Sequence, residues 1–416
     1  IKSAIDSEKV TSTWIPNINP ELLVPTDTAN FCSMASVNSN FNLYLFCRII
    51  KKFGKIPFRL KEDASFLNSL DLSETTSLTC SLDIKKINRN FARAILKKSP
   101  DGFYKIILCS SGLSFWDNLK LVSSLGQFPF VAPFISQCRT PIKKNLRNNI
   151  KVPDETNEFE SILNNLLVEQ LPKSFLEDYL AILDKSTETY PKRTKVILTA
   201  NKMSVCPDEG FRFWVASQVE KGAKLVLAQH GGGYGLFSSF SEKHEVEIAD
   251  KFFSWGWGGE QPKVSPMASG QLQSTRYNIR SDPSGEILWV NSSAPLFFTR
   301  LDHVASGWSG LNFFLQQKRF LNFVCPEAYK LLLVRPFSKD YGWNEKKRLE
   351  DIYPSLKLYR GKDSMLQQLR GSRLCIHDYF GTSWLETLSM NFPTVIFWDL
   401  NRVHTLASVQ PYLDDL

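Results

Sequence analysis

The stretch from residue 195 to residue 235 constrains the fold more than any other part of the chain. An apolar run, Lys195–Thr199, leads through a loop ending at Pro207 into a helix-length segment, Asp208–Lys221, and then into a second apolar run, Leu225–Ala228. Short apolar runs on either side of such a segment predict neighbouring parallel strands joined by a right-handed crossover. The chain is therefore expected to fold as an α/β protein.

A glycine-rich turn, Gln229–Gly235, follows the second of these predicted strands and carries His230. In open α/β sheets, ligands bind outside the carboxyl ends of the strands, and glycines there let backbone N–H groups approach an anionic ligand. The alternative is a tight turn whose histidine is merely hydrogen-bonded. We favour a ligand site in which the glycines lie close to a sugar or an acceptor.

A second series of predicted strands occupies the carboxyl-terminal half. A helix, Glu242–Ala249, and a strand, Phe252–Trp257, are followed by four more apolar runs: Ile287–Val290, Leu331–Val334, Leu374–Ile376 and Thr394–Trp398. Two successive α/β series predict two Rossmann-like domains facing a cleft. We expect an acceptor-binding and catalytic domain at residues 1–270 and a nucleotide-sugar-binding domain at residues 271–416.

Composition excludes several classes of protein. The 416 residues are 43% hydrophobic and 22% charged, which is typical of a globular protein. No apolar run reaches the roughly 18 residues of a membrane span, and no signal pattern opens the chain, so we expect a cytoplasmic protein. The eight cysteines form no Cys-x-x-Cys pair, and the five histidines form no His-x-x-x-His pair, so we expect no disulfide scaffold and no metal site.

The net charge is +8, and basic residues cluster in two stretches, Ile142–Arg147 and Lys346–Arg348. Neither contains the interleaved aromatics of a nucleic-acid surface, so no nucleic-acid partner is expected. Contact with anionic lipid is one interpretation of these clusters. Solvated helix faces are the interpretation that we favour.

The segment Ile376–Val395 carries the residues expected to bind the donor. A strand ending near His377 leads into a loop with Thr382 and Ser383, whose hydroxyl and N–H groups would hold a diphosphate or phosphodiester at a helix start. Glu386, one turn later, is placed to accept hydrogen bonds from ribose hydroxyls. The alternative is a capping box, because Ser383 and Glu386 have the Ser-x-x-Glu spacing.

The loop after strand Leu331–Val334 offers further donor-binding residues. Arg335 and Lys339 would neutralise a donor phosphate or a sugar carboxylate. Tyr341 or Trp343 would stack on a base, although loop aromatics are more often packing anchors.

The residues expected to perform chemistry lie in the first half: Asp208, Glu209, His230 and Glu242. Carboxylates beside a histidine suit acid–base or nucleophilic work at a glycosidic centre. Asp208 and Glu209 also fall in the first turn of a predicted helix, where acids are favoured by the helix dipole alone. Asp250 is expected at the opposite edge of the sheet, in a capping role.

A series of motifs gives the chain a family resemblance. Gln229–Gly235, Glu242–Glu245, Ser254–Trp257, Lys339–Trp343 and Thr382–Thr387 occur in the order found in transferases of bacterial O-antigen and surface-polysaccharide gene clusters, which the chain resembles from Lys195 onward. The helix–turn–strand segment ending at Ile396 is similar to the donor-binding domain of GT-B glycosyltransferases and related sugar-nucleotide epimerases. The resemblance implies a metal-independent glycosyltransferase of GT-B-like fold.

Within that group the chain is similar to the β-Kdo transferase domains of bacterial O-antigen synthases, which have a modified GT-B fold. This similarity implies a CMP-β-Kdo donor, a lipid-linked oligosaccharide acceptor and retention through an aspartate nucleophile, with Asp208 as the first choice, then Glu209 and Glu242, and then Asp250. The chain lacks the His-Pro pair that contacts the CMP phosphate in sialyltransferase-like enzymes.

We also expect peripheral contact with the inner membrane. The absence of an initiator Met and the abrupt end at Leu416 lead us to expect a fragment of a larger multidomain synthase. A sugar-nucleotide epimerase and a non-catalytic module of a polysaccharide assembly complex are the alternative functions.

Overall fold

The computed structural model describes residues 11–54, 56–61, 103–127, 140–151, 157–200, 203, 208–238, 240, 242–273, 279–297, 308–399 and 403–415. The chain divides into two compact units. The first combines residues 1–99, 132–192 and 204–217, and the second combines residues 100–131, 193–203 and 218–416. The chain therefore enters each unit more than once. The division of function at residue 270 stays a prediction.

The first unit is mostly helical in its described part. Helix α3 ends at Gly54, whose N–H donates to the Ile50 carbonyl. Leu23, Phe41 and Tyr44 pack together in the core of the first unit. Its elements are β1 (Thr13–Pro16), η1 (Pro20–Leu23), α2 (Thr28–Val37), α3 (Ser39–Phe53), β2 (Phe58–Lys61), α7 (Lys144–Asn148), α8 (Glu158–Gln170), η2 (Lys173–Phe175) and α9 (Tyr179–Thr189).

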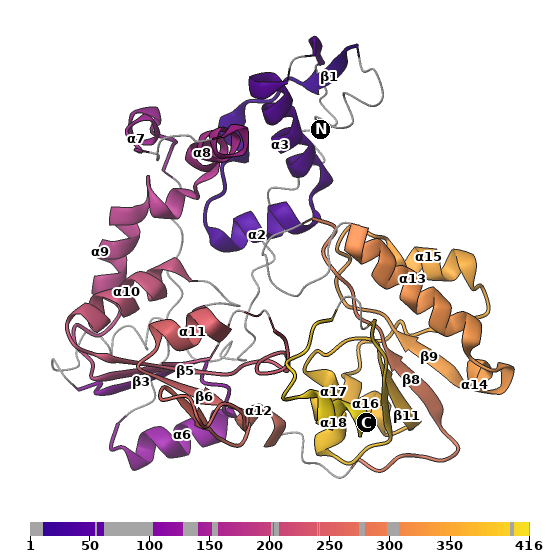
Figure 1. Cartoon of the computed structure of the whole chain (residues 1–416). Helices are drawn as coiled ribbons and strands as arrows, with labels where there is room; N and C mark the ends of the chain where they lie inside the picture. Colours follow the sequence, from indigo (N-terminus) through magenta and orange to yellow (C-terminus); the bar gives the residue numbers. More distant parts are fainter. Residues whose placement is uncertain are drawn as a thin grey trace. The chain divides into compact units, whose positions relative to one another are not determined.

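Helix α10 (Glu209–Glu220) begins in the first unit and ends in the second, where it leads into a five-stranded sheet. The strands are β3 (Ile106–Cys109), β4 (Val196–Thr199), β5 (Lys224–Ala228), β6 (Lys251–Ser254) and β7 (Val264–Pro266). They lie in the order β3-β4-β5-β6-β7, and every described pair is parallel. In Figure 1, α11 (Glu242–Ile248) lies on one side of this sheet and α6 (Phe115–Ser124) on the other.

The second unit contains a second parallel sheet, in the order β10-β9-β8-β11-β12. Its strands are β8 (Glu286–Val290), β9 (Leu332–Arg335), β10 (Lys357–Leu358), β11 (Ser372–His377) and β12 (Thr394–Ile396). The chain runs outward from β8 in one direction and then returns to the other side of β8 with β11. The order therefore reverses between β8 and β11, and such a switch point is where doubly wound sheets form a ligand crevice.

Alternating side chains explain why this second sheet is covered on both faces. Trp289 packs with Phe314 of α13 (Trp308–Phe323), while Leu288 on the other face packs with Leu369 of α16 (Met365–Leu369). Successive side chains of a strand point to opposite faces, so an uninterrupted apolar run demands helices on both sides. The remaining helices of the unit are α12 (Gly270–Gln273), α14 (Pro326–Leu331), α15 (Glu345–Ile352), α17 (Ser383–Ser389) and α18 (Gln410–Asp414).

The structure confirms the α/β class with parallel sheets, and it corrects two strand predictions. Strand β6 ends at Ser254, before the expected Trp257, because the chain turns at Gly256, whose φ is +107°. Strand β7 is not predicted, since it has three residues and ends on Pro266. None of the described helices has the length and apolar character needed to cross a membrane.

Candidate active site

The turn after β5 is held in one shape by the loop that follows β6. The Gln229 side chain is buried, and its Oε1 accepts hydrogen bonds from the Trp255 backbone N–H at 2.8 Å and from the Trp257 indole N–H at 2.7 Å. Its Nε2 donates to the Gly231 carbonyl at 2.7 Å. Gly235 has a φ of +68°, and a Cβ there would lie 2.5 Å from the Trp257 ring. The turn is therefore a rigid, sequence-specific structure.

The same turn contacts the loop that follows β11 in the second sheet. The Gly232 N–H donates to the Thr382 hydroxyl at 3.3 Å, and a Cβ on Gly232 would lie 2.2 Å from the Gly381 carbonyl oxygen. Only glycine permits so close an approach of two backbones. Both loops leave the carboxyl ends of their strands, so the carboxyl ends of two parallel sheets meet here.

An apolar cluster keeps these two loops together. Phe237, two residues after the glycine turn ends, packs edge-on against Phe380 with ring centroids 6.2 Å apart. The cluster also includes Leu236, Trp384 and Leu413, all buried. In addition, the Leu406 N–H donates to the Leu236 carbonyl at 2.9 Å. The contact between the sheets is thus part of the core of the second unit.

His230 belongs to a chain of hydrogen bonds inside the glycine turn. The Tyr234 hydroxyl lies 2.9 Å from His230 Nδ1 and 3.3 Å from Nε2, and it donates to Glu245 Oε2 at 2.8 Å. Tyr234 and Glu245 are 4% and 3% exposed, whereas His230 is half-buried. The Tyr234 hydroxyl therefore connects the buried Glu245 carboxylate of α11 to the His230 ring.

On the opposing loop, His377 is a buried anchor at the end of β11. It is 1% exposed, and its ring lies 3.2 Å from Ser383 Oγ, 3.3 Å from Thr387 Oγ1 and 3.4 Å from Cys375 Sγ. Burial lowers the pKa of this imidazole to about 4, because the charged form loses its hydration. The neutral His377 ring thus holds the start of α17 in place through its contacts with Ser383 and Thr387.

Thr382 and Glu386 lie on one face of α17. They are four residues apart, and the Glu386 N–H donates to the Thr382 carbonyl at 3.2 Å. The Glu386 carboxyl is half-buried, no hydrogen bond to it is found within the described residues, and burial raises its pKa. Its binding role stays a prediction, whereas the Thr382 hydroxyl contacts the glycine turn.

The switch point between β8 and β11 contains a buried carboxyl, Asp378. It accepts hydrogen bonds from the Ser292 N–H at 2.9 Å, the Gln317 amide at 2.9 Å and the Asn291 amide at 3.4 Å. Burial raises its pKa to about 7 despite these donors. Burial also raises the pKa of Glu345, at the start of α15, to about 7, and the nearby charge of Asp378 adds to this shift.

The carboxyl ends of two parallel sheets meet here. One loop carries His230, linked through Tyr234 to the buried Glu245, and the other leads to the half-buried Glu386. The family model described as LIC12162 family transferase matches the chain over residues 1–416. The chain belongs to this transferase family. No curated protein matches it.

Two of the acids expected in catalysis of this LIC12162 family transferase lie buried in the first unit. Asp208 caps α10, with its Oδ1 accepting the Phe211 N–H at 3.1 Å, and it is 6% exposed. Glu209 is 7% exposed, and its Oε1 accepts the Thr28 N–H at 3.1 Å at the start of α2. Their described bonds are therefore those of helix starts.

Glu242 and Asp250 lie at the two ends of the segment that holds α11. Glu242 opens α11 and is 8% exposed. Asp250 lies at the amino edge of β5, where its carboxylate accepts the Leu225 N–H at 2.9 Å and pairs with Lys224 at 2.8 Å. The Lys224 bond lowers the pKa of Asp250. Asp250 is thus on the edge away from the glycine turn.

The donor-loop residues after β9 are engaged with one another or with α16. Arg335 donates to the Asp363 carbonyl at 2.9 Å and to the Gln368 amide oxygen. The Lys339 ammonium lies 5.2 Å from the Tyr341 ring centroid, and the Phe337 ring stacks on Tyr341 at 5.6 Å. No described contact joins these residues to Thr382 or Glu386.

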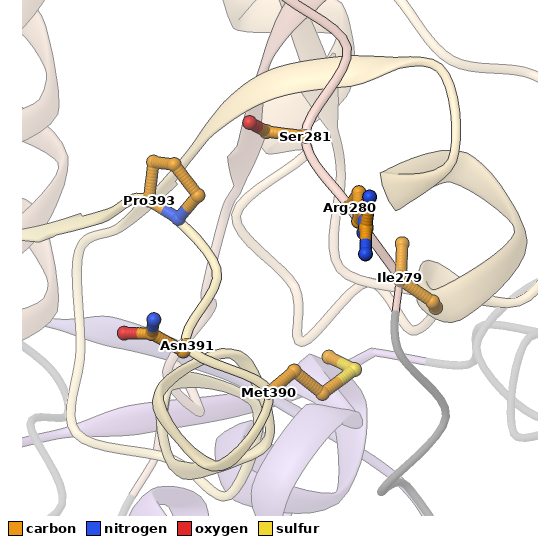
Figure 2. Close-up of a pocket in the computed structure, with 6 residues that line it drawn as sticks. All are labelled: Ile279, Arg280, Ser281, Met390, Asn391 and Pro393. Carbon is orange, nitrogen blue, oxygen red and sulfur yellow. The ribbon is translucent and has the colours of Figure 1, made fainter.

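A pocket of about 480 Å³ lies at the other edge of the second sheet. Figure 2 shows its lining, which comes from the segment before β8 and from the turn between α17 and β12: Ile279, Arg280, Ser281, Met390, Asn391 and Pro393. This is the amino edge of the strands. The candidate active site lies at the carboxyl edge, where Thr382 follows β11.

Several expectations concern residues outside the described ranges, among them Cys80, Cys138, Cys206 and most of the loop before Asp208. Within the described ranges, no group of three or more His, Cys, Asp or Glu side chains is arranged to hold a metal ion.

Sequence reasoning did not single out Tyr234, Glu245, Gln229 or Asp378. One signal in the sequence could have identified Glu245, because it is the last residue of the motif Glu242–Glu245 that contributes to the family resemblance.

Proposed function

We propose that this transferase is a glycosyltransferase that moves a sugar from a nucleotide donor to an oligosaccharide acceptor. The contact between Gly232 and the Gly381–Thr382 loop is the observation that carries the proposal. It brings the ligand-binding edges of two parallel sheets together, which suits a reaction with two substrates, one held by each sheet. Membership of the transferase family is consistent with this reaction.

In this proposal the second sheet holds the donor. The backbone and hydroxyl groups of Thr382 and Ser383 would face the phosphate, and Glu386 would accept hydrogen bonds from the ribose. Glu386 supports this role because it is half-buried and its carboxyl has no hydrogen-bond partner among the described residues. His377 would act behind these residues, through its contacts with Ser383 and Thr387. Arg335, Lys339 and Tyr341 remain candidates for the more distant parts of the donor.

The first sheet would supply the chemistry through His230. Of the four candidate catalytic residues, it is the half-buried one, whereas Asp208, Glu209 and Glu242 are each less than 9% exposed. A histidine at this edge is suited to take the proton of an acceptor hydroxyl.

The motif resemblance suggests the finer identity of the substrates. We propose Kdo from CMP-β-Kdo as the donor sugar, transferred with retention, and a lipid-linked oligosaccharide of the O-antigen of lipopolysaccharide, or of another surface polysaccharide, as the acceptor. Such an acceptor would bring the protein to the inner membrane peripherally. No observation favours the epimerase or the non-catalytic module over transfer.

Thermal denaturation with CMP, UDP, GDP and dTDP tests the donor proposal. A ligand that binds only the folded protein stabilises it by about 2.7 kcal/mol at 100 times its Kd, so the correct nucleotide should raise the Tm most. We expect CMP to do so, and Glu386→Gln to reduce the shift. Glu327→Gln, an exposed change on α14, should leave it intact.

A shift with UDP or GDP alone would overturn the Kdo donor, and no shift with any nucleotide would overturn the donor site. Incubation of CMP-Kdo without acceptor provides a further check, because an epimerised nucleotide sugar would contradict transfer.

A further inference from the structure

The start of helix α6 exposes two aromatic rings at one edge of the sheet β3–β7. Phe115 is 51% exposed and Trp116 is 68% exposed. They form an edge-on pair, with ring centroids 5.5 Å apart and an interplanar angle of 76°. Single apolar side chains on a surface are ordinary, whereas two large adjacent rings indicate a surface that binds something.

The register of the sheet places this pair at the same edge as His230. Cys109 at the end of β3 pairs with Thr199, which pairs with Leu227 of β5, and the three strands are parallel. The loop that leads to α6 therefore leaves the sheet level with the turn that carries His230. Neighbouring strands lie about 4.8 Å apart, so the ends of β3 and β5 are separated by about 10 Å. A ligand that contacts both loops must be an extended one.

Helix periodicity shows which side of α6 carries Phe115. Seven residues make about two turns, so Phe115 and Val122 share one face of the helix. Val122 is buried, so this is the covered face of α6. Phe115 is nevertheless half exposed, because it is the first helical residue and directly follows the loop at the carboxyl edge.

Hydrogen bonds hold the start of α6 in one conformation. The Asn118 amide donates to the Leu113 and Ser114 carbonyls, both at 3.0 Å. The Ser114 hydroxyl caps the helix by accepting the Asp117 N–H at 3.1 Å, and the Ser111 hydroxyl donates to Asn118 Oδ1 at 2.7 Å. A surface that is already ordered loses little conformational entropy when a ligand binds.

The same loop is connected to the donor side of the candidate site. A Cβ on Gly270 would lie 2.6 Å from the Leu113 side chain, so the start of α12 abuts the loop. Helix α12 in turn packs against α17, which carries Glu386. One short helix therefore links the exposed rings to the predicted donor helix.

The chemistry of this surface suits a sugar better than a charged lipid. The C–H groups of a pyranose form an apolar face that stacks on an aromatic ring, and the Trp116 indole N–H can donate to a sugar hydroxyl. Binding to anionic lipid would instead require a cluster of basic residues. Helix α6 carries Lys120 and Asp117, whose charges cancel.

We propose that Phe115 and Trp116 form a stacking platform for a sugar ring of the oligosaccharide acceptor. The platform binds a sugar other than the one that receives the new bond, because β3 is two strands away from β5 and His230. Its position and rigidity stand on the contacts of α6, whereas the identity of its ligand rests on the proposed glycosyl transfer.

An array of bacterial surface oligosaccharides tests the platform without any donor. The wild-type protein should bind one or more of these glycans, and Trp116→Ala should raise the Kd about tenfold, which corresponds to about 1.4 kcal/mol. Trp116→Phe keeps an aromatic face and should lose less. The control is Phe323→Ala, which removes an 88% exposed ring at the end of α13 and should bind like wild type.

Urea denaturation distinguishes a ligand platform from a packing anchor. Trp116→Ala should unfold at the same urea concentration as wild type, and a clearly lower midpoint would overturn the proposal. Glycan binding that is unchanged in Trp116→Ala, or absent from the wild-type protein, would also overturn it. So would binding to phosphatidylglycerol vesicles that depends on Trp116, because the surface would then recognise lipid.

A transfer assay with a glycan found on the array separates the platform from the proposed function. Trp116→Ala should raise the KM for this acceptor about tenfold and leave kcat nearly unchanged. Glycan binding that depends on Trp116, without transfer by the wild-type protein, would keep the platform and refute the glycosyltransferase. Transfer with the same acceptor KM in Trp116→Ala and wild type would keep the glycosyltransferase and refute the platform.

Discussion

The Gly232 N–H donates to the Thr382 hydroxyl at 3.3 Å, across 150 positions of sequence. This single bond joins the loop after β5 to the loop after β11. Each loop lies at the carboxyl end of a parallel strand, so the bond marks the place where the two sheets of the second unit meet.

Gly232→Ala should destabilise the protein, whereas Gly231→Ala should not. The added methyl at residue 232 would lie 2.2 Å from the Gly381 carbonyl oxygen, and at residue 231 it would lie 3.7 Å from Thr382 Oγ1, an ordinary contact. Overpacking of this kind costs about 1–3 kcal/mol. Urea denaturation of both variants measures the difference, and equal stabilities would show that the two loops do not touch in solution.

Replacing Gln229 by leucine should cost more than an ordinary surface change. The leucine would leave the Trp255 N–H, the Trp257 indole N–H and the Gly231 carbonyl without their partner. Each buried polar group left unpaired costs about 1–3 kcal/mol. Gln261→Leu, at an exposed position, is the matched control, expected within about 0.5 kcal/mol of wild type by chemical denaturation. A Gln229→Leu variant as stable as this control would contradict the rigid turn.

Asp378 should make stability fall as the pH rises. Its folded pKa, about 7, lies above its ordinary value of 3.8, so the folded protein binds more protons between these limits. The stability that this group contributes is complete below pH 4 and is lost as the pH rises to 7. Asp378→Asn removes that loss, so its stability relative to wild type should rise by up to about 1.4 kcal/mol per pH unit across this window.

Denaturation of Asp378→Asn and wild type at pH 4.5, 6 and 7.5 gives the slope. The exposed variant Asp351→Asn should follow wild type throughout. A relative stability of Asp378→Asn that falls with rising pH would have the wrong sign for a buried carboxyl.

Asp208 variants distinguish capping from catalysis. Asparagine caps a helix about as well as aspartate, and alanine loses about 1 kcal/mol. We therefore expect Asp208→Asn to keep wild-type stability and Asp208→Ala to lose it in chemical denaturation. Because Asp208 is buried and bonded to the Phe211 N–H, we also expect Asp208→Asn to keep its transfer rate. Loss of transfer with unchanged stability would instead identify the nucleophile.

The secondary structure could be read from the sequence wherever hydrophobic spacing is local and regular. The predicted strands over residues 195–199 and 225–228 appear as β4 and β5 with boundaries within one residue, and the helix between them appears as α10. Short apolar strands separated by helix-length segments are compatible with few folds other than a parallel α/β sheet, because both faces of such strands must be covered. The short strand β7, which ends on a proline, carries no such signal.

The sequence by itself determined an α/β chain with parallel sheets and a glycine turn beside a histidine. Only the tertiary structure decided which groups meet there. Glu245 reaches His230 through Tyr234, and Gly232 abuts Gly381, because helix packing and sheet order bring separate segments together. Periodicity records which face of an element is buried, whereas the partner across that face depends on packing that no local pattern encodes.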